Sequence, residues 1–170
     1  IVGITPEAPT LEAALGGRKP LAEFEIGKRE LDEAYNIATT ATDPNVDYVF
    51  LGCPHVTAAE LRDIAQALDG KKVNPNVKLV VSTTWQFLET AEDMGYADII
   101  RKAGAILTQD MCIAFSGTQV SGTIATDSIK AAFFYTGFSS KTTRRVWFGT
   151  IQDCIRAAIT VKPQQFHSLS

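Results

Sequence analysis

Short apolar runs alternate with segments of helical periodicity along most of this chain. The runs predict strands at residues 48–51, 79–81, 105–107, 123–125 and 146–148. Apolar positions three and four residues apart predict helices at residues 58–68, 85–94, 97–103, 129–135 and 151–159. Strands that alternate with helices in this way are typical of βα units built on a parallel sheet. We therefore expect a Rossmann-like α/β fold of three layers, with a mostly parallel sheet between two layers of helices.

The N-terminal stretch has a weaker pattern. It predicts a strand at Ile1–Ile4, a short helix at Leu11–Leu15 that Thr10 caps, and an edge strand at Phe24–Gly27. A longer helix is expected from Lys28 to about Thr40. Because the chain opens without a Met on a segment that already reads as a strand, we expect it to be part of a longer protein.

The composition allows one substantial core. The 170 residues are 45% hydrophobic, which is enough for a single domain. We expect one α/β/α lobe over residues 1–162 and a polar tail over residues 163–170, whose His167 is assigned no role. The net charge is −3 and basic residues are scattered among acidic ones, so no basic stripe for nucleic acid is present. The apolar runs are also too short to span a membrane, so we expect no membrane partner.

The three cysteines are too widely spaced for a disulfide framework. We therefore expect reduced thiols and a cytoplasmic location. Cys154 lies on the apolar side of an expected helix, and we assign it to the core. The other two, Cys53 and Cys112, follow expected strands.

Cys53, His55 and Cys112 all come just after apolar runs. The carboxyl ends of parallel strands meet at one edge of a sheet, where open α/β folds bind ligands, so we expect these residues at that edge. Thr57 and Glu60 have the spacing of a capping box, which predicts a helix N-terminus that favours a nearby thiolate. A buried, inert thiol is the alternative for each cysteine. Two thiols and one imidazole are too few for a closed zinc site.

Four further polar side chains follow apolar runs and are candidates for substrate binding: Thr83, Thr126, Ser128 and Lys130. Hydroxyl groups, free N–H groups and an ammonium at a helix start suit a phosphate or a carboxylate. Ordinary helix capping is the alternative, and Asp127 is the alternative partner for Lys130. No GxGxxG, GxxxxGK[ST] or GxSxG motif is present, so the sequence has no dinucleotide fingerprint, phosphate loop or nucleophile elbow.

Four segments of the chain occur in the same order in a known family: GITPEAPT at 3–10, GCPH at 52–55, Asp110–Cys112 and Thr126–Lys130. On these segments the chain resembles aconitase X, of the aconitase superfamily, over nearly its whole length. The sequence departs from that family at Met111, where relatives usually have Thr, and at Asp127, where they usually have Asn. A His that is common in the helix after the lysine is replaced here by Phe133-Phe134.

The resemblance implies a hydro-lyase with an iron–sulfur cluster, 4Fe-4S or 2Fe-2S, that three cysteines hold. Cys53 and Cys112 are then two of the metal ligands, and the third lies outside this chain. His55 is the implied catalytic residue, as a donor to a sulfide or to the departing oxygen.

The implied substrate is a small hydroxy acid, cis-3-hydroxy-L-proline or mevalonate 5-phosphate, bound by the four polar side chains named above. The implied partners are the N-terminal remainder of the large subunit or domain and a swivel domain or small subunit. A non-catalytic α/β ligand-binding or regulatory domain, with idle cysteines, is the alternative from another class of protein.

Overall fold

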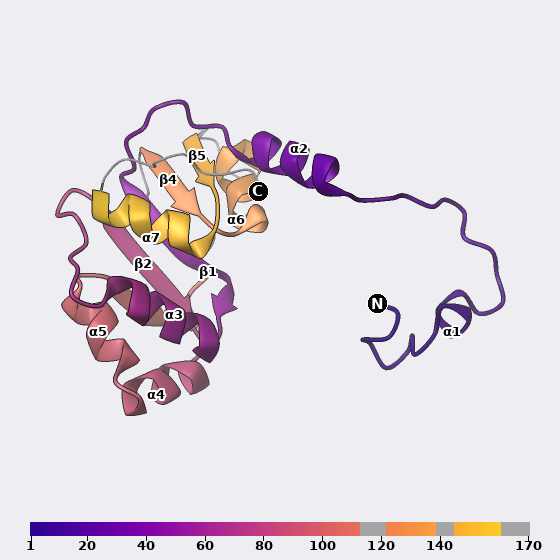
Figure 1. The fold of residues 1–170 in the computed structure, drawn as a ribbon, viewed down its shortest axis with the longest axis horizontal. Coiled ribbons are helices and arrows are strands. Elements are labelled where there is room, and N and C mark those ends of the chain that lie inside the picture. The colour runs from indigo at the N-terminus through magenta and orange to yellow at the C-terminus, as the bar shows by residue number, and fades with distance from the viewer. Residues whose placement is uncertain (113–121, 139–144, 161–170) are drawn as a thin grey trace. The chain divides into compact units, whose positions relative to one another are not determined.

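The computed structural model describes residues 1–112, 122–138 and 145–160, and Figure 1 shows its ribbon. The chain divides into two units, Ile1–Glu30 and Leu31–Ser170. The expected polar tail at 163–170, with His167, lies outside the described residues. No helix in the described part of the chain is long and apolar enough to cross a membrane.

The first unit contains one short helix, α1 (Leu11–Leu15), which begins as expected after Thr10. The Thr10 hydroxyl accepts a hydrogen bond from the backbone N–H of Ala13 at 3.1 Å. The predicted strand at Ile1–Ile4 is wrong. The carbonyl of Ile1 instead accepts hydrogen bonds from the N–H groups of Ile4 and Thr5, at 3.1 and 2.9 Å. These turns satisfy the backbone locally, so no partner strand is needed.

The predicted edge strand at Phe24–Gly27 is also wrong. This segment pairs with no strand among the residues that the structure describes, and Phe24 is exposed. Its last N–H group, that of Gly27, donates to the Glu30 carboxylate at 2.9 Å, at the start of the next helix. The alternation of polar and apolar residues here did not indicate a strand, because no described strand pairs with the segment.

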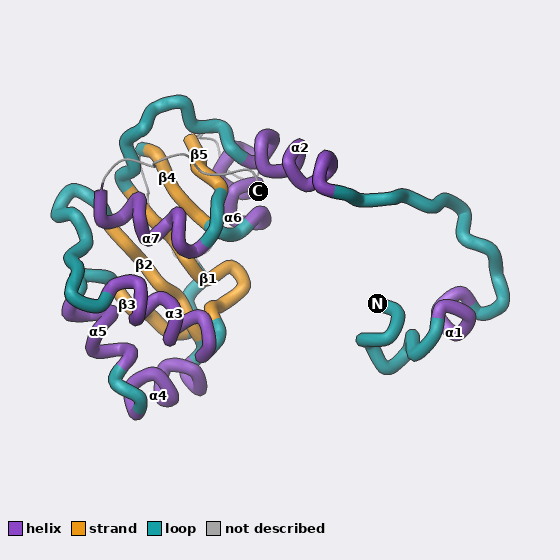
Figure 2. The backbone as a smooth tube through the Cα atoms, viewed as in Figure 1, coloured by secondary structure: helices purple, strands orange, loops and turns teal. Residues whose placement is uncertain are grey.

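The second unit is built on a sheet of five parallel strands in the order β3-β2-β1-β4-β5, as Figure 2 shows. The strands are β1 (Tyr48–Val56), β2 (Lys78–Thr83), β3 (Ile106–Gln109), β4 (Thr123–Thr126) and β5 (Arg145–Phe148). All five expected strands of this unit are therefore confirmed. The order reverses between β1 and β4, which makes this position the switch point of a doubly wound sheet.

Helices cover both faces of the sheet, as expected. They are α2 (Lys28–Ala38), α3 (Ala58–Leu68), α4 (Trp85–Asp93), α5 (Tyr96–Lys102), α6 (Ile129–Phe133) and α7 (Ile151–Thr160). The helix expected at 129–135 is shorter as an α-helix, because a π-helical turn, η1 (Phe134–Phe138), follows α6 directly.

Alternate residues of β1 enter two separate cores. Val49 and Leu51 pack with α3, α5 and α7 on one face, whereas Tyr48 and Phe50 pack with α6 and the end of α2 on the other. This alternation follows from the two-residue period of a strand. The fold therefore has the three expected layers, with β1 buried on both sides at its centre.

Strand β1 extends beyond Leu51, where the apolar run ends, to Val56. Its pairing with β2 becomes irregular there: from Leu51↔Val81 to Val56↔Thr83, β1 advances five residues while β2 advances two. The extra residues of β1 bulge out of the regular ladder. The bulge contains Cys53, Pro54 and His55, and the Cys53–Pro54 peptide bond is cis.

Candidate functional site

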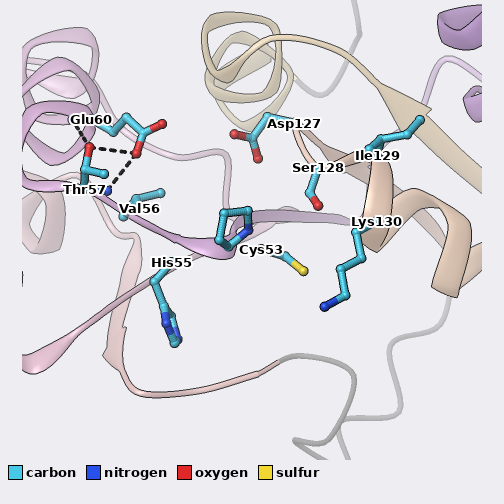
Figure 3. A pocket seen from close by; sticks show the side chains of 10 residues that line it. Cys53, His55, Val56, Thr57, Glu60, Asp127, Ser128, Ile129 and Lys130 are labelled. Atoms are coloured by element: carbon cyan, nitrogen blue, oxygen red, sulfur yellow. Dashed lines mark hydrogen bonds between the residues drawn. The ribbon is translucent and has the colours of Figure 1, made fainter. Parts of the chain in front are cut away.

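A cavity of about 340 Å³ lies at the carboxyl end of β1 and the start of α6. Figure 3 shows the side chains that line it: Cys53, Pro54, His55, Val56, Thr57, Glu60, Asp127, Ser128, Ile129 and Lys130. Because β1 and β4 are neighbours at the switch point of the sheet, this is where an open α/β fold binds its ligand. The structure thus brings Cys53, His55, Ser128 and Lys130 around one cavity, whereas the sequence pattern predicts only that they follow strand ends.

The helix behind the bulge begins as expected. The Thr57 hydroxyl accepts from the N–H of Glu60 at 3.3 Å, and the Glu60 carboxylate accepts from the N–H of Thr57 at 2.7 Å. This reciprocal capping box fixes the N-terminus of α3 at one wall of the cavity (Figure 3). The positive end of the helix dipole therefore lies beside the bulge that carries Cys53.

Cys53 and Cys112 lie at the same edge of the sheet, as expected. Cys53 is half-buried in the bulge of β1, and Cys112 is exposed, three residues after the end of β3. Strands β1 and β3 are parallel and flank β2, so their carboxyl ends point the same way. The third thiol, Cys154, is buried in the core of α7, where burial raises its pKa well above the ordinary value.

The segment between β3 and Cys112 is hydrogen-bonded to the ends of β1 and β2. The N–H of Asp110 donates to the Thr83 carbonyl at 2.8 Å. The carbonyl of Met111 accepts from the Ser82 hydroxyl at 2.8 Å and lies 3.3 Å from Nε2 of His55. These contacts were not expected from the sequence, because they join residues of three strands through a backbone carbonyl.

Lys130 extends from the first turn of α6 into the cavity. Its ammonium lies 6.0 Å from the centre of the Phe134 ring, and it forms no ion pair among the described residues. Figure 3 shows the Cys53 sulfur and the Lys130 ammonium on the same side of the cavity, whereas the carboxylate of Asp127 points toward Glu60. The structure therefore does not support the alternative that Lys130 is paired with Asp127.

Asp127 also lines the cavity, and the sequence pattern predicts no functional role of its own for it. Its Oδ1 atom is buried and has no hydrogen-bond partner in the part of the chain that the structure describes. The pKa of this carboxyl is raised to about 6, mainly because burial disfavours the charged form; its own backbone hydrogen bond lowers the pKa in part, and the charge of Glu60 raises it slightly. The expected departure from the family's pattern at position 127 was the only sequence signal for this feature.

Thr83 and Thr126, two of the four expected substrate-binding residues, do not line the cavity. Both are fully buried. The Thr83 hydroxyl donates to the Val56 carbonyl at 2.7 Å, and that of Thr126 accepts from the N–H of Ser128 at 3.2 Å. These hydroxyls therefore stabilise the strand ends. The Ser128 hydroxyl also caps α6, since it accepts from the N–H of Ala131 at 3.0 Å.

The donor atoms at this edge fit an iron–sulfur cluster in kind, because thiolates are the usual ligands of such clusters. They do not complete a site: the described residues contain no group of three or more His, Cys, Asp or Glu side chains placed to hold a metal ion.

The fold and the site together define the class of protein. It is an α/β domain whose cavity, at the switch point of the sheet, is lined by a thiol, an imidazole and an ammonium group. The chain belongs to the aconitase X family, since the family model described as the aconitase X third domain matches residues 46–160. The resemblance stated from the sequence is confirmed.

Individual relatives agree with this assignment. The chain is 31% identical over 163 residues to the cis-3-hydroxy-L-proline dehydratase of Pseudomonas aeruginosa, covering 94% of this chain and 28% of the relative. It is 33% identical over 138 residues to the phosphomevalonate dehydratase large subunit of Methanocaldococcus jannaschii, covering 80% and 33%. The crystal structure of Thermococcus kodakaraensis aconitase X in its holo-form has the same fold, with a TM-score of 0.70, 24% identity and coverage of 82% and 35%. The chain thus spans about a third of the length of these proteins.

Proposed function

We propose that this chain is one domain of an iron–sulfur hydro-lyase that removes water from a small hydroxy acid. The observation that carries the proposal is the cavity at the switch point, where Cys53, His55 and Lys130 meet in a domain that matches the aconitase X family. The substrate is cis-3-hydroxy-L-proline or mevalonate 5-phosphate, the two classes that the names of the relatives indicate.

Cys53 and Cys112 are the proposed cluster ligands of this domain. Their position at one edge of the sheet supports the assignment. When bound, a cluster with an open iron position supplies a Lewis acid for the departing hydroxyl group. Cys154 takes no part, because it is buried in the core.

Lys130 is the proposed anchor for the negative group of the substrate, a carboxylate or a phosphate. Its ammonium reaches the cavity and has no counter-ion among the described residues. A bound anion would supply that missing partner through a charge-assisted hydrogen bond. Ser128 lines the same wall, although its hydroxyl oxygen already accepts the capping hydrogen bond of α6. Its O–H can still donate to the substrate.

His55 is the proposed catalytic residue, with a role that depends on its tautomer. If Nε2 carries the proton and donates to the Met111 carbonyl, a neutral ring presents Nδ1 as an acceptor. Nδ1 could then take up a proton, and only the doubly protonated ring could donate to the departing oxygen. Thr83 and Thr126 are not proposed as substrate ligands, because their hydroxyls hold the strand ends.

The proposed partners are the remainder of the large subunit or domain, which would supply the third cluster ligand, and a swivel domain or small subunit that would close the site. The small share of each relative that this chain spans supports such partners. We also propose that the enzyme is cytoplasmic, because its ligand thiols must stay reduced.

The test is an assay of the complete enzyme after anaerobic reconstitution with ferrous iron and sulfide. Each substrate is supplied separately, and the dehydrated product is measured with and without reconstitution. Iron-dependent turnover of one substrate would support the proposal. A protein that retains iron but turns over neither substrate, or that retains none, would favour the non-catalytic alternative.

A further inference from the structure

The carbonyl oxygen of Met111 is the acceptor for side chains of two neighbouring strands. The hydroxyl of Ser82, on β2, donates to it at 2.8 Å, and Nε2 of His55, in the bulge of β1, lies 3.3 Å away. A carbonyl oxygen has two lone pairs, so both can be used at once. One backbone atom after β3 is thereby held from two directions.

This carbonyl belongs to the peptide unit that joins Met111 to Cys112. The unit is planar and includes the Cα atom of Cys112. Two hydrogen bonds to its oxygen therefore fix the orientation of the plane and, with it, the place from which the Cys112 side chain starts. One residue earlier, the N–H of Asp110 donates to the Thr83 carbonyl. The segment from Asp110 to Met111 is therefore held at both ends.

The position of Ser82 is itself determined by close packing. Ser82 is fully buried and lies against Gly52, whose lack of a Cβ allows the two strands to approach. A buried hydroxyl has little freedom to turn to another acceptor, since water is excluded around it. Its bond to the Met111 carbonyl is therefore a fixed feature of the strand end.

We propose that Ser82 and His55 are positioning residues, which hold the Met111 carbonyl so that the thiol of Cys112 is presented at the same edge as Cys53. The inference rests on the proposed function, in which Cys112 is a cluster ligand. It gives a second role to His55 and a first one to Ser82, neither of which requires contact with the substrate.

The test compares Ser82→Ala with Thr83→Val in the complete enzyme. Both substitutions remove a buried hydroxyl at the end of β2, but that of Thr83 donates to Val56 and not to Met111. After reconstitution with ferrous iron and sulfide, the rate of iron loss to an excess of ferrozine is measured. We expect loss from Ser82→Ala to be about fivefold faster, the worth of one hydrogen bond, and loss from Thr83→Val to change less than about twofold.

His55 is tested by rescue. The amide of His55→Gln can still donate to the Met111 carbonyl, so its iron loss should lie close to that of the unmodified enzyme, whereas His55→Ala should resemble Ser82→Ala. Amide hydrogen exchange in the iron-free enzyme gives a readout independent of the cluster. Ser82→Ala should speed exchange of the Asp110 amide about fivefold.

The possible outcomes separate this inference from the proposed function. If the unmodified enzyme retains no iron, or if Cys112→Ser retains all of it, the proposed function fails and the inference fails with it. If Cys112→Ser loses iron while Ser82→Ala behaves like the unmodified enzyme, only the inference is overturned. If Ser82→Ala does not fold, the His55 variants decide the question: equal rates of iron loss from His55→Gln and His55→Ala would overturn the inference.

Discussion

Gly52 of β1 lies directly against Ser82 of β2, so close that a side chain at position 52 has no room. An added Cβ would lie 2.8 Å from the Cβ of Ser82 and 3.0 Å from its backbone nitrogen, and φ of Gly52 is +129°. Only glycine adopts this conformation at low cost. The contact occurs where β1 leaves the regular ladder, one residue before Cys53, so it holds the start of the bulge against β2.

We expect Gly52→Ala to lower the free energy of unfolding by more than about 3 kcal/mol, because it adds both a steric clash and backbone strain. Gly70→Ala is the matched control. Gly70 also has a positive φ, +68°, but no atom lies within 4 Å of an added Cβ, so the expected loss is about 1 kcal/mol. Denaturant titration of both variants measures the difference. Equal losses would show that the approach of Gly52 to Ser82 is not a constraint.

Asp127 should make stability depend on pH. Its pKa is raised to about 6 in the folded protein, so the carboxyl binds its proton more tightly there than in the unfolded chain. Its contribution to stability is therefore present below about pH 4 and is lost as the pH rises toward about 6. Asp127→Asn removes this dependence.

We expect Asp127→Asn to raise the free energy of unfolding by about 2 kcal/mol near pH 7.5, and to have little effect near pH 4. Denaturant titrations of both proteins over this range of pH measure the gap between them. A gap that stays constant with pH would contradict the assignment of the raised pKa to Asp127.

The sequence was sufficient to predict elements that bury an apolar face. The helix expected at 58–68 is present as α3 and buries its apolar positions Leu61, Ile64, Ala65 and Leu68, and each expected strand of the sheet is present. In residues 1–30 the same reasoning gave two strands that do not exist. Short apolar segments indicate a strand only when a neighbouring strand can pair with them, and the local sequence does not contain that information.

The site could be predicted only in part, for a similar reason. Polar residues that follow apolar runs predict the binding edge of the sheet, and this was enough to expect Cys53, His55 and Lys130 after strand ends. The strand order, which makes β1 and β4 neighbours, depends on the whole chain. The contacts of the Met111 carbonyl involve a backbone atom, and because every residue has a backbone carbonyl, residue types do not predict such contacts. The burial of the Thr83 and Thr126 hydroxyls likewise follows from tertiary packing.

A substitution at Lys130 distinguishes a role in substrate binding from a role in the stability of α6. Since Lys130 has no ion pair with Asp127, Lys130→Met should leave the free energy of unfolding nearly unchanged. In the complete enzyme it should raise KM or lower kcat/KM by roughly 10- to 100-fold, the worth of a charge-assisted contact. Lys130→Arg should keep part of the activity, and Lys102→Met, away from the cavity on α5, should keep all of it. Steady-state kinetics of the three variants measure the difference, after the visible absorbance has shown that each retains its cluster. An unchanged kcat/KM in Lys130→Met would show that Lys130 has no role in substrate binding.

The three thiols should differ in reactivity. In the iron-free protein we expect iodoacetamide to modify the exposed Cys112 first and the half-buried Cys53 more slowly. Cys154 should react more than about 100-fold slower than Cys112, because it is buried and its pKa is raised. Mass spectrometry of the peptides over time measures each rate. Labelling of Cys154 as fast as that of Cys112 in the folded protein would place it outside the core.

The central claim is that this domain contributes Cys53 and Cys112 to an iron–sulfur cluster. Its most direct test is the iron and sulfide content per chain of the complete enzyme, reconstituted anaerobically and desalted, in Cys53→Ser, Cys112→Ser and the control Cys154→Ala. We expect each serine variant to lose most of its iron and the visible absorption of the cluster, while Cys154→Ala keeps both. Full iron and sulfide content in either serine variant would contradict it.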